Sequence, residues 1–114
     1  MDLSDITKEI IAFRDERDWK KFHNPKDLAL SLTLEATEVL EHFQWKSQDE
    51  IRQYIQSNKS DIGEELADVL YWVLLMSHDL EINILESLNQ KMKENRKKYP
   101  INKSKGVSTK YNKL

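Results

Sequence analysis

Residues 65–76 of this 114-residue chain read ELADVLYWVLLM. From Val69 to Met76 every residue is apolar, so a helix over this stretch is apolar on every face and must be buried all round. The stretch is too short to cross a bilayer, and a chain of this length has little core with which to bury it alone. The sequence therefore predicts an all-α fold, a helical bundle of about five helices that oligomerisation completes.

Helix caps and helix breakers place the remaining helices. The chain has only two Gly and two Pro, which favours long helices. Four of the five helices are expected to begin at a capping side chain: Asn24, Ser47, Ser60 or Asp61, and Asn83. The expected helices run from about 3 to about 19, from 25 to about 43, over a short segment from 48, from the 60–61 cap to about 78, and from 84 to about 99. Because Pro100 ends the last helix, residues 1–100 are predicted to form one helical domain, and residues 101–114 an irregular, basic C-terminal tail.

Charge is distributed unevenly along the chain. The net charge is −2, but residues 1–90 carry 9 Lys/Arg against 19 Asp/Glu, and residues 91–114 carry 9 Lys/Arg against one acid. An acidic body with a basic end suits a cation together with a phosphorylated ligand, whereas nucleic-acid-binding proteins more usually carry basic charge on the folded body. No Cys is present and no secretory signal is visible, so we expect a cytoplasmic protein that binds neither nucleic acid nor a membrane.

Two acidic pairs with the same spacing suggest a metal site. Glu35 and Glu38 lie three residues apart on a largely apolar helix, and Glu65 and Asp68 lie three apart directly before the apolar stretch. Carboxylates near apolar surface need a counter-charge, and neither helix supplies a matching set of Arg or Lys. Oxygen ligands favour Mg²⁺, Mn²⁺ or Ca²⁺ over Zn²⁺, and the Glu-x-x-His pairs of di-iron bundles are absent. The alternative is a solvated charged face, which is the more common role of any single Glu on a helix.

With these pairs, the chain resembles the MazG-like all-α nucleoside-triphosphate pyrophosphohydrolases, whose signature is E-x-x-E, a spacer and E-x-x-D. Here the two motifs are Glu35–Glu38 and Glu65–Asp68, with 26 residues between them. The flanking segments are also similar to the dCTP pyrophosphatase branch of that family. These segments read RDWKKFH at 17–23, EHFQWK at 41–46, EELADVL at 64–70 and KMKENRKKYP at 91–100.

The resemblance implies a helical bundle whose active sites are completed between the subunits of a homodimer or homotetramer. It implies Mg²⁺, with Mn²⁺ as a substitute, held by Glu35, Glu38, Glu65 and Asp68, of which Glu38 and Glu65 are the expected catalytic residues. It implies a nucleoside triphosphate, dCTP or a modified dCTP, that is converted to its monophosphate and pyrophosphate. The expected substrate contacts are Trp19, Lys21, His23, Trp45, Trp72, Lys91 and Asn95.

Several of these residues can instead have a purely structural role. Trp19 and His23 flank a turn and can form a hydrophobic staple, while Trp72 can be a core residue. The chain also differs from the dCTP pyrophosphatase branch at Ile10, where the branch carries His, and at Trp72, where it carries Tyr. The alternative functions are a non-catalytic nucleotide-binding or regulatory helical dimer, a purely structural dimerisation bundle, and the same chemistry on a different nucleotide, such as dUTP or phosphoribosyl-ATP.

Overall fold

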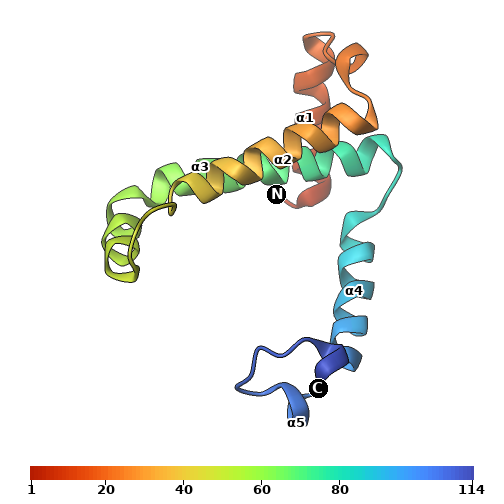
Figure 1. Cartoon of the computed structure of the whole chain (residues 1–114). Helices are drawn as coiled ribbons and strands as arrows, with labels where there is room; N and C mark the ends of the chain where they lie inside the picture. Colours follow the sequence, from red (N-terminus) through yellow and green to blue (C-terminus); the bar gives the residue numbers. More distant parts are fainter. The chain divides into compact units, whose positions relative to one another are not determined.

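The computed structural model describes residues 1–114, and all of its regular elements are helical (Figure 1). The α-helices are α1 (Leu3–Glu16), α2 (Pro25–Glu41), α3 (Gln48–Asp79), α4 (Ile84–Lys98) and α5 (Ile101–Ser104), and two 3₁₀ turns are η1 (Lys20–Phe22) and η2 (Tyr111–Lys113). The predicted all-α fold of about five helices is confirmed. The chain divides into two compact units, Met1–Glu81 and Ile82–Leu114, which are described separately below.

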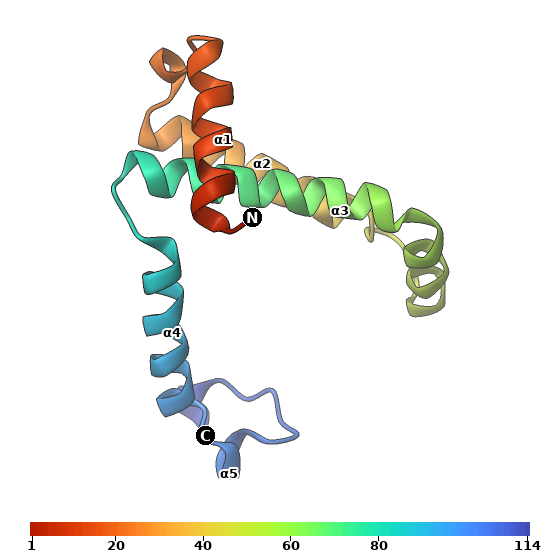
Figure 2. The same cartoon turned by 180° about the vertical axis from the view of Figure 1, so that it is seen from behind.

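In the first unit, α2 packs along α3, and α1 packs on α3 as well (Figures 1 and 2). Local cap chemistry begins these helices as the sequence predicts. The Asn24 side chain accepts a hydrogen bond from the Asp27 backbone N–H, and Pro25 takes the first helical position of α2. Ser47 and Glu50 form a reciprocal capping box at the start of α3.

The predicted break between a third and a fourth helix is placed differently in the structure. The two helical parts of α3 meet at a kink at Asn58, where φ is −128° and ψ is 21°, rather than at a cap at Ser60 or Asp61. Asn58 Nδ2 donates a hydrogen bond to the Tyr54 backbone carbonyl at 2.9 Å. This side-chain bond competes with the helical hydrogen-bond ladder, so the break comes before Ser60, which lies inside the helix.

The predicted end of the first helix at residue 19 is also wrong, because α1 stops at Glu16. Asp18 adopts a left-handed backbone conformation with φ of 53°, which Asp tolerates better than most residues. The Trp19 N–H then donates to the Arg14 carbonyl at 3.2 Å and closes the end of the helix. Trp19 therefore belongs to the turn before η1 rather than to α1.

The core of the first unit is small. Its buried apolar residues are Ile10, Leu28, Leu74 and Leu75. The apolar stretch of α3 is therefore buried only in part within the single chain, and Leu70 is 45% exposed. None of the helices is both long enough and apolar enough to span a membrane.

The second unit is built around α4. Asn83 caps this helix through the Glu86 N–H, and the helix ends before Pro100, both as predicted. Beyond Pro100 the chain is more ordered than the expected irregular tail, since it forms the short helix α5 and the turn η2. The Tyr99 and Tyr111 rings meet edge to face at 6.1 Å between centroids. A domain boundary at residue 100 stays a prediction.

Candidate metal centre

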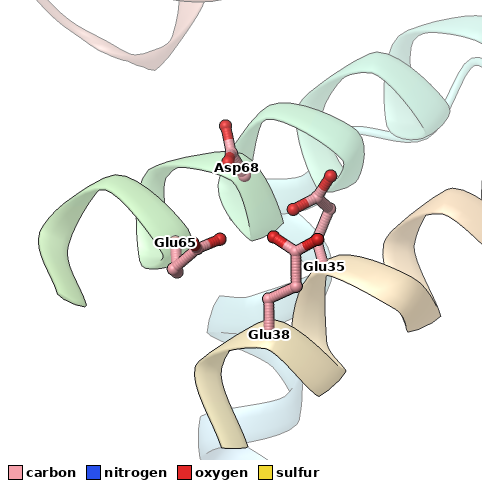
Figure 3. Close-up of side chains that lie close together, drawn as sticks. All are labelled: Glu35, Glu38, Glu65 and Asp68. Carbon is pink, nitrogen blue, oxygen red and sulfur yellow. The ribbon is translucent and has the colours of Figure 1, made fainter. Parts of the chain in front are cut away.

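The structure brings the two predicted acidic pairs together from two helices. Glu35 and Glu38 come from α2, and Glu65 and Asp68 from the facing part of α3 (Figure 3). One carboxylate oxygen from each of the four lies within 4.8 Å of the others. Each pair has i,i+3 spacing, so its two side chains share one helix face. The packing of α2 on α3 turns these two faces toward each other.

Burial and mutual repulsion make this cluster electrostatically unfavourable without a cation. The pKa of Glu65 is raised to about 7, first by a hydrogen bond with the Glu38 side chain that favours the protonated form, then by desolvation and the neighbouring charges. The pKa of Glu35 is also raised, mainly by desolvation and then by Glu38. No Lys, Arg or His makes an ion pair with any of the four carboxylates. The positive charge that would balance them is not supplied by the chain.

Two buried oxygens give the most specific sign of a missing partner. Oε2 of Glu35 and Oε2 of Glu65 are both buried without a hydrogen-bond partner. A buried charged oxygen without a partner is costly, and a coordinated cation satisfies it. The donor set consists only of carboxylate oxygens, which suits a hard divalent cation such as Mg²⁺, Mn²⁺ or Ca²⁺. Asp68 is exposed, so the cluster is open to solvent on that side.

An aromatic edge lies next to the carboxylates along α3. Trp72 follows Asp68 by one helical turn and is half-buried. Its ring meets that of His23 edge to face at 5.6 Å and that of Tyr71 at 5.1 Å. Desolvation and then the charge of Arg14 lower the pKa of His23. The structure therefore joins two of the predicted substrate contacts, Trp72 and His23, into one surface.

The other predicted contacts of the first unit lie in turns. Trp19 is 43% exposed and packs edge to face on Phe13, with 5.6 Å between ring centroids. Lys21 is exposed, and its Nζ lies 3.1 Å from Asp18 Oδ2. Trp45 is 91% exposed and has a left-handed backbone conformation with φ of 67°. Their role in substrate binding stays a prediction.

Lys91 and Asn95 belong to the second unit. They lie one turn apart on α4, where Lys91 is exposed and Asn95 is half-buried. Lys91 Nζ lies 3.9 Å from Glu94 Oε2, a loose surface pair. A contact of these two residues with phosphates stays a prediction.

The sequence reasoning missed one buried charged pair. Arg14 is 1% exposed, and its guanidinium donates two hydrogen bonds to Asp79, Nη1 to Oδ2 at 2.6 Å and Nη2 to Oδ1 at 2.9 Å. The available signal was position, because Arg14 follows Ile6 and Ile10 at four-residue steps on the buried face of α1. Its partner lies at the far end of α3, and no local pattern indicates it.

Comparisons with known proteins agree with this geometry. The family model described as the MazG-like family matches residues 30–114, which include all four carboxylates. The chain belongs to the MazG-like family. Among its relatives, mouse dCTP pyrophosphatase 1 is 35% identical, and the match covers 98% of this chain and 67% of the relative. Human dCTP pyrophosphatase 1 is 33% identical, with the same coverage of each chain.

A solved structure supports the all-α fold and the pyrophosphatase relationship. The crystal structure of a pyrophosphatase from Archaeoglobus fulgidus is 41% identical, with a TM-score of 0.81, covering 85% of this chain and 91% of that one. This likeness confirms the all-α fold as that of a MazG-like protein. The family match and the relatives together show that this MazG-like chain is a hydrolase of the diphosphatase class.

Proposed function

We propose that this MazG-like protein is a Mg²⁺-dependent nucleoside-triphosphate pyrophosphohydrolase that converts dCTP, or a modified dCTP, to its monophosphate and pyrophosphate. The observation that carries the proposal is the cluster of four carboxylates, gathered from α2 and α3 without a protein counter-charge. The names of the mouse and human relatives favour dCTP as the substrate.

Glu35, Glu38, Glu65 and Asp68 would hold the cation, and their chemistry fits it. All four offer hard oxygen ligands, and two of them bury an oxygen that has no other partner. When bound, Mg²⁺ supplies charge stabilisation to phosphate oxygens and lowers the pKa of a coordinated water. Mn²⁺ would substitute, because it accepts the same oxygen ligands.

The chain's own residues would act on the attacking water. The water oxygen forms a bond to phosphorus, the bond between the α-phosphorus and the bridging oxygen breaks, and pyrophosphate leaves with the electron pair. A carboxylate of the cluster orients the water and accepts its proton, and we assign this role to Glu38 or Glu65. No Ser or Cys nucleophile is needed, because water reacts directly.

The aromatic edge would bind the base. Trp72 lies one helical turn beyond Asp68 and its ring meets that of His23, so a base bound on this surface would place its phosphates on the side of the carboxylates. Stacking of a base on an aromatic side chain contributes about 1–3 kcal/mol. Trp19, Lys21 and Trp45 lie in turns from which their side chains reach solvent, and we assign them supporting contacts with base, sugar or phosphate.

We further propose that the protein acts as a homodimer or homotetramer. The single chain leaves large apolar side chains of α2 and α3 half exposed, among them Leu34 at 57%, Leu66 at 54% and Leu70 at 45%. Apolar surface of this kind is usually covered by a partner. A second copy of the chain offers the same helices and so an apolar face of matching character.

The test is a panel of canonical and modified nucleoside triphosphates with purified protein, with Mg²⁺ and with chelator, in which pyrophosphate and orthophosphate are measured separately. We expect pyrophosphate in equal amount to the monophosphate, only with the cation, and fastest with dCTP or a modified dCTP. Nucleotide binding without any product would support a regulatory protein instead. Faster turnover of another triphosphate would keep the chemistry and change the substrate.

A further inference from the structure

The ion pair between Arg14 and Asp79 lies near the aromatic edge formed by Trp72 and His23. Arg14 comes from the buried face of α1, and Asp79 is the last residue of α3. The two parallel hydrogen bonds fix both the distance and the plane of the two groups. The pair therefore fixes the end of α3 against α1.

Asp79, the acidic member of the pair, forms part of a cavity wall next to His23. A cavity of about 350 Å³ is lined by His23, Asp79, Lys20 and His78 together with the start of α2. His23 itself is half-buried, and its Nδ1 is buried without a hydrogen-bond partner. The His23 ring is therefore held by its surroundings rather than by a hydrogen bond of its own.

The charges of the pair act on His23. Desolvation is the main cause that lowers the pKa of this imidazole; the Arg14 charge lowers it further and the Asp79 charge opposes the shift. The ring also meets that of Trp72, with 5.6 Å between ring centroids and 75° between the ring planes. His23 thus contacts Trp72 and lines the same cavity as Asp79.

Stability alone does not explain a charged pair at this position. Replacing a buried ion pair with apolar residues of similar size is often neutral or stabilising, whereas removing one partner is strongly destabilising. An ion pair at this position is therefore better explained by a need for defined side-chain geometry than by stability. A bidentate Arg–carboxylate contact supplies that geometry better than apolar packing does.

We propose that the Arg14–Asp79 ion pair is a positioning device that holds His23 against Trp72 and thereby sets the affinity for the base end of the nucleotide. This inference rests on the proposed function for its substrate. Neither residue is proposed to touch the nucleotide. Both act through His23.

The test compares the single variant R14M with the double variant R14M/D79L, which removes both charges. R14M should lose stability, because it leaves Asp79, whose side chain is only 16% exposed, without its partner. The double variant should recover wild-type thermal stability. It should nevertheless show about a tenfold higher KM for dCTP with kcat within about twofold of wild type, as expected when a binding contact and no transition-state contact is lost. The matched control is R52M, which removes an exposed Arg–Asp pair at the start of α3 and should change neither parameter.

Two further readouts separate this inference from the proposed function. The His23 ring protons should lose the ring-current shift from Trp72 in the NMR spectrum of the double variant, whether or not the protein turns over nucleotide. The Kd for dCTP should rise about tenfold in parallel, as measured by tryptophan fluorescence.

Wild-type KM, Kd and His23 resonances in a stable double variant would overturn the positioning role. Absence of pyrophosphate release by the wild-type protein would instead overturn the proposed function, and Kd and the His23 resonances would still decide the role of the pair. If the double variant does not fold, D79N serves as the second variant, with the same expected rise in KM and Kd and the same overturning result.

Discussion

Glu35 on α2 and Glu65 on α3 each bury their Oε2 oxygen without a hydrogen-bond partner, in the same cluster of four carboxylates. Neither residue can relieve the other, because both carry the same charge when ionised. A cation shared between the two helices would satisfy both oxygens and also strengthen the contact of α2 with α3. Catalysis and stability should therefore depend on the same four side chains.

Removing one ligand charge should abolish most of the activity. E38Q and D68N keep the size of the side chain but weaken the hold on the cation, so pyrophosphate release should fall by about 100-fold or more. The measurement is the initial rate of pyrophosphate release at a Mg²⁺ concentration that just saturates the wild-type protein, with circular dichroism to verify folding. D61N is the matched control, since Asp61 is exposed and lies one turn before Glu65 on the same helix. Well-folded E38Q and D68N enzymes with near-wild-type rates would contradict the metal site.

The contribution of Glu65 to the stability of the cation-free protein should fall as the pH rises. The pKa of Glu65 is raised in the folded state from an ordinary value of 4.5 to about 7, so between these values the folded state binds a proton that the unfolded chain has lost. This contribution to the free energy of unfolding then decreases with increasing pH across this window, and Glu35 contributes in the same direction. In chelator, the melting temperature of the wild-type protein should fall more, or rise less, between pH 5 and pH 7.5 than that of the variant E65Q, which lacks the Glu65 contribution.

Two additions make this pH experiment specific. E65Q removes the titrating group, so it should remove this part of the pH dependence of the melting temperature. Added Mg²⁺ or Mn²⁺ should raise the melting temperature of the wild-type protein at pH 7.5, because a ligand of the folded state stabilises it. A wild-type melting temperature that neither rises with added cation nor differs in its pH dependence from that of E65Q would contradict a shared cation site.

Trp45 should be dispensable for stability and important for substrate. Its side chain is 91% exposed and its φ of 67° is strained for any residue with a Cβ, so W45G should keep or raise the free energy of unfolding, by up to about 1 kcal/mol. The same change should raise the KM for dCTP if Trp45 contacts the nucleotide. Urea unfolding and steady-state kinetics measure the two effects. A clear loss of stability would contradict the expectation that Trp45 is dispensable for folding.

A charge on the apolar face of α3 should disrupt the proposed oligomer. Leu70 lines an apolar groove with Ile6, Ile10 and Leu74 and is 45% exposed in the single chain. L70E should shift the protein toward monomer in light scattering, because a buried carboxylate without a partner is costly at an interface. K59E, an exposed charge change on the same helix, is the control. An unchanged oligomer would place the interface elsewhere.

Local chemistry explains which elements could be predicted from the sequence. Asn24, Ser47 and Asn83 begin helices as predicted, because an N-cap acts within three residues of itself. The meeting of the four carboxylates could be predicted, because two acidic i,i+3 pairs on largely apolar helices need a shared counter-charge, and few ways of packing the two helices supply one. The kink at Asn58 could not be distinguished from a cap at Ser60, since both side chains bond readily to nearby backbone.

Long-range pairing explains what could not be predicted. The pairing of Arg14 with Asp79 joins opposite ends of the first unit, and nothing near either residue indicates the other. The neighbourhood of His23 and Trp72 likewise follows only once α2 is packed on α3. The exposure of Leu70 in the single chain also depends on packing. The sequence indicates that the apolar stretch of α3 needs to be buried, but not which surface covers it.

All four carboxylates of the cluster come from one uninterrupted segment, α2 with α3 and the turn that joins them. A single stretch of gene therefore encodes the whole ligand set. Duplication of that stretch, or its insertion into an unrelated protein, would carry every ligand along at once. Evolution can multiply or relocate such a centre in one event, which is not open to sites whose ligands are scattered over the polypeptide.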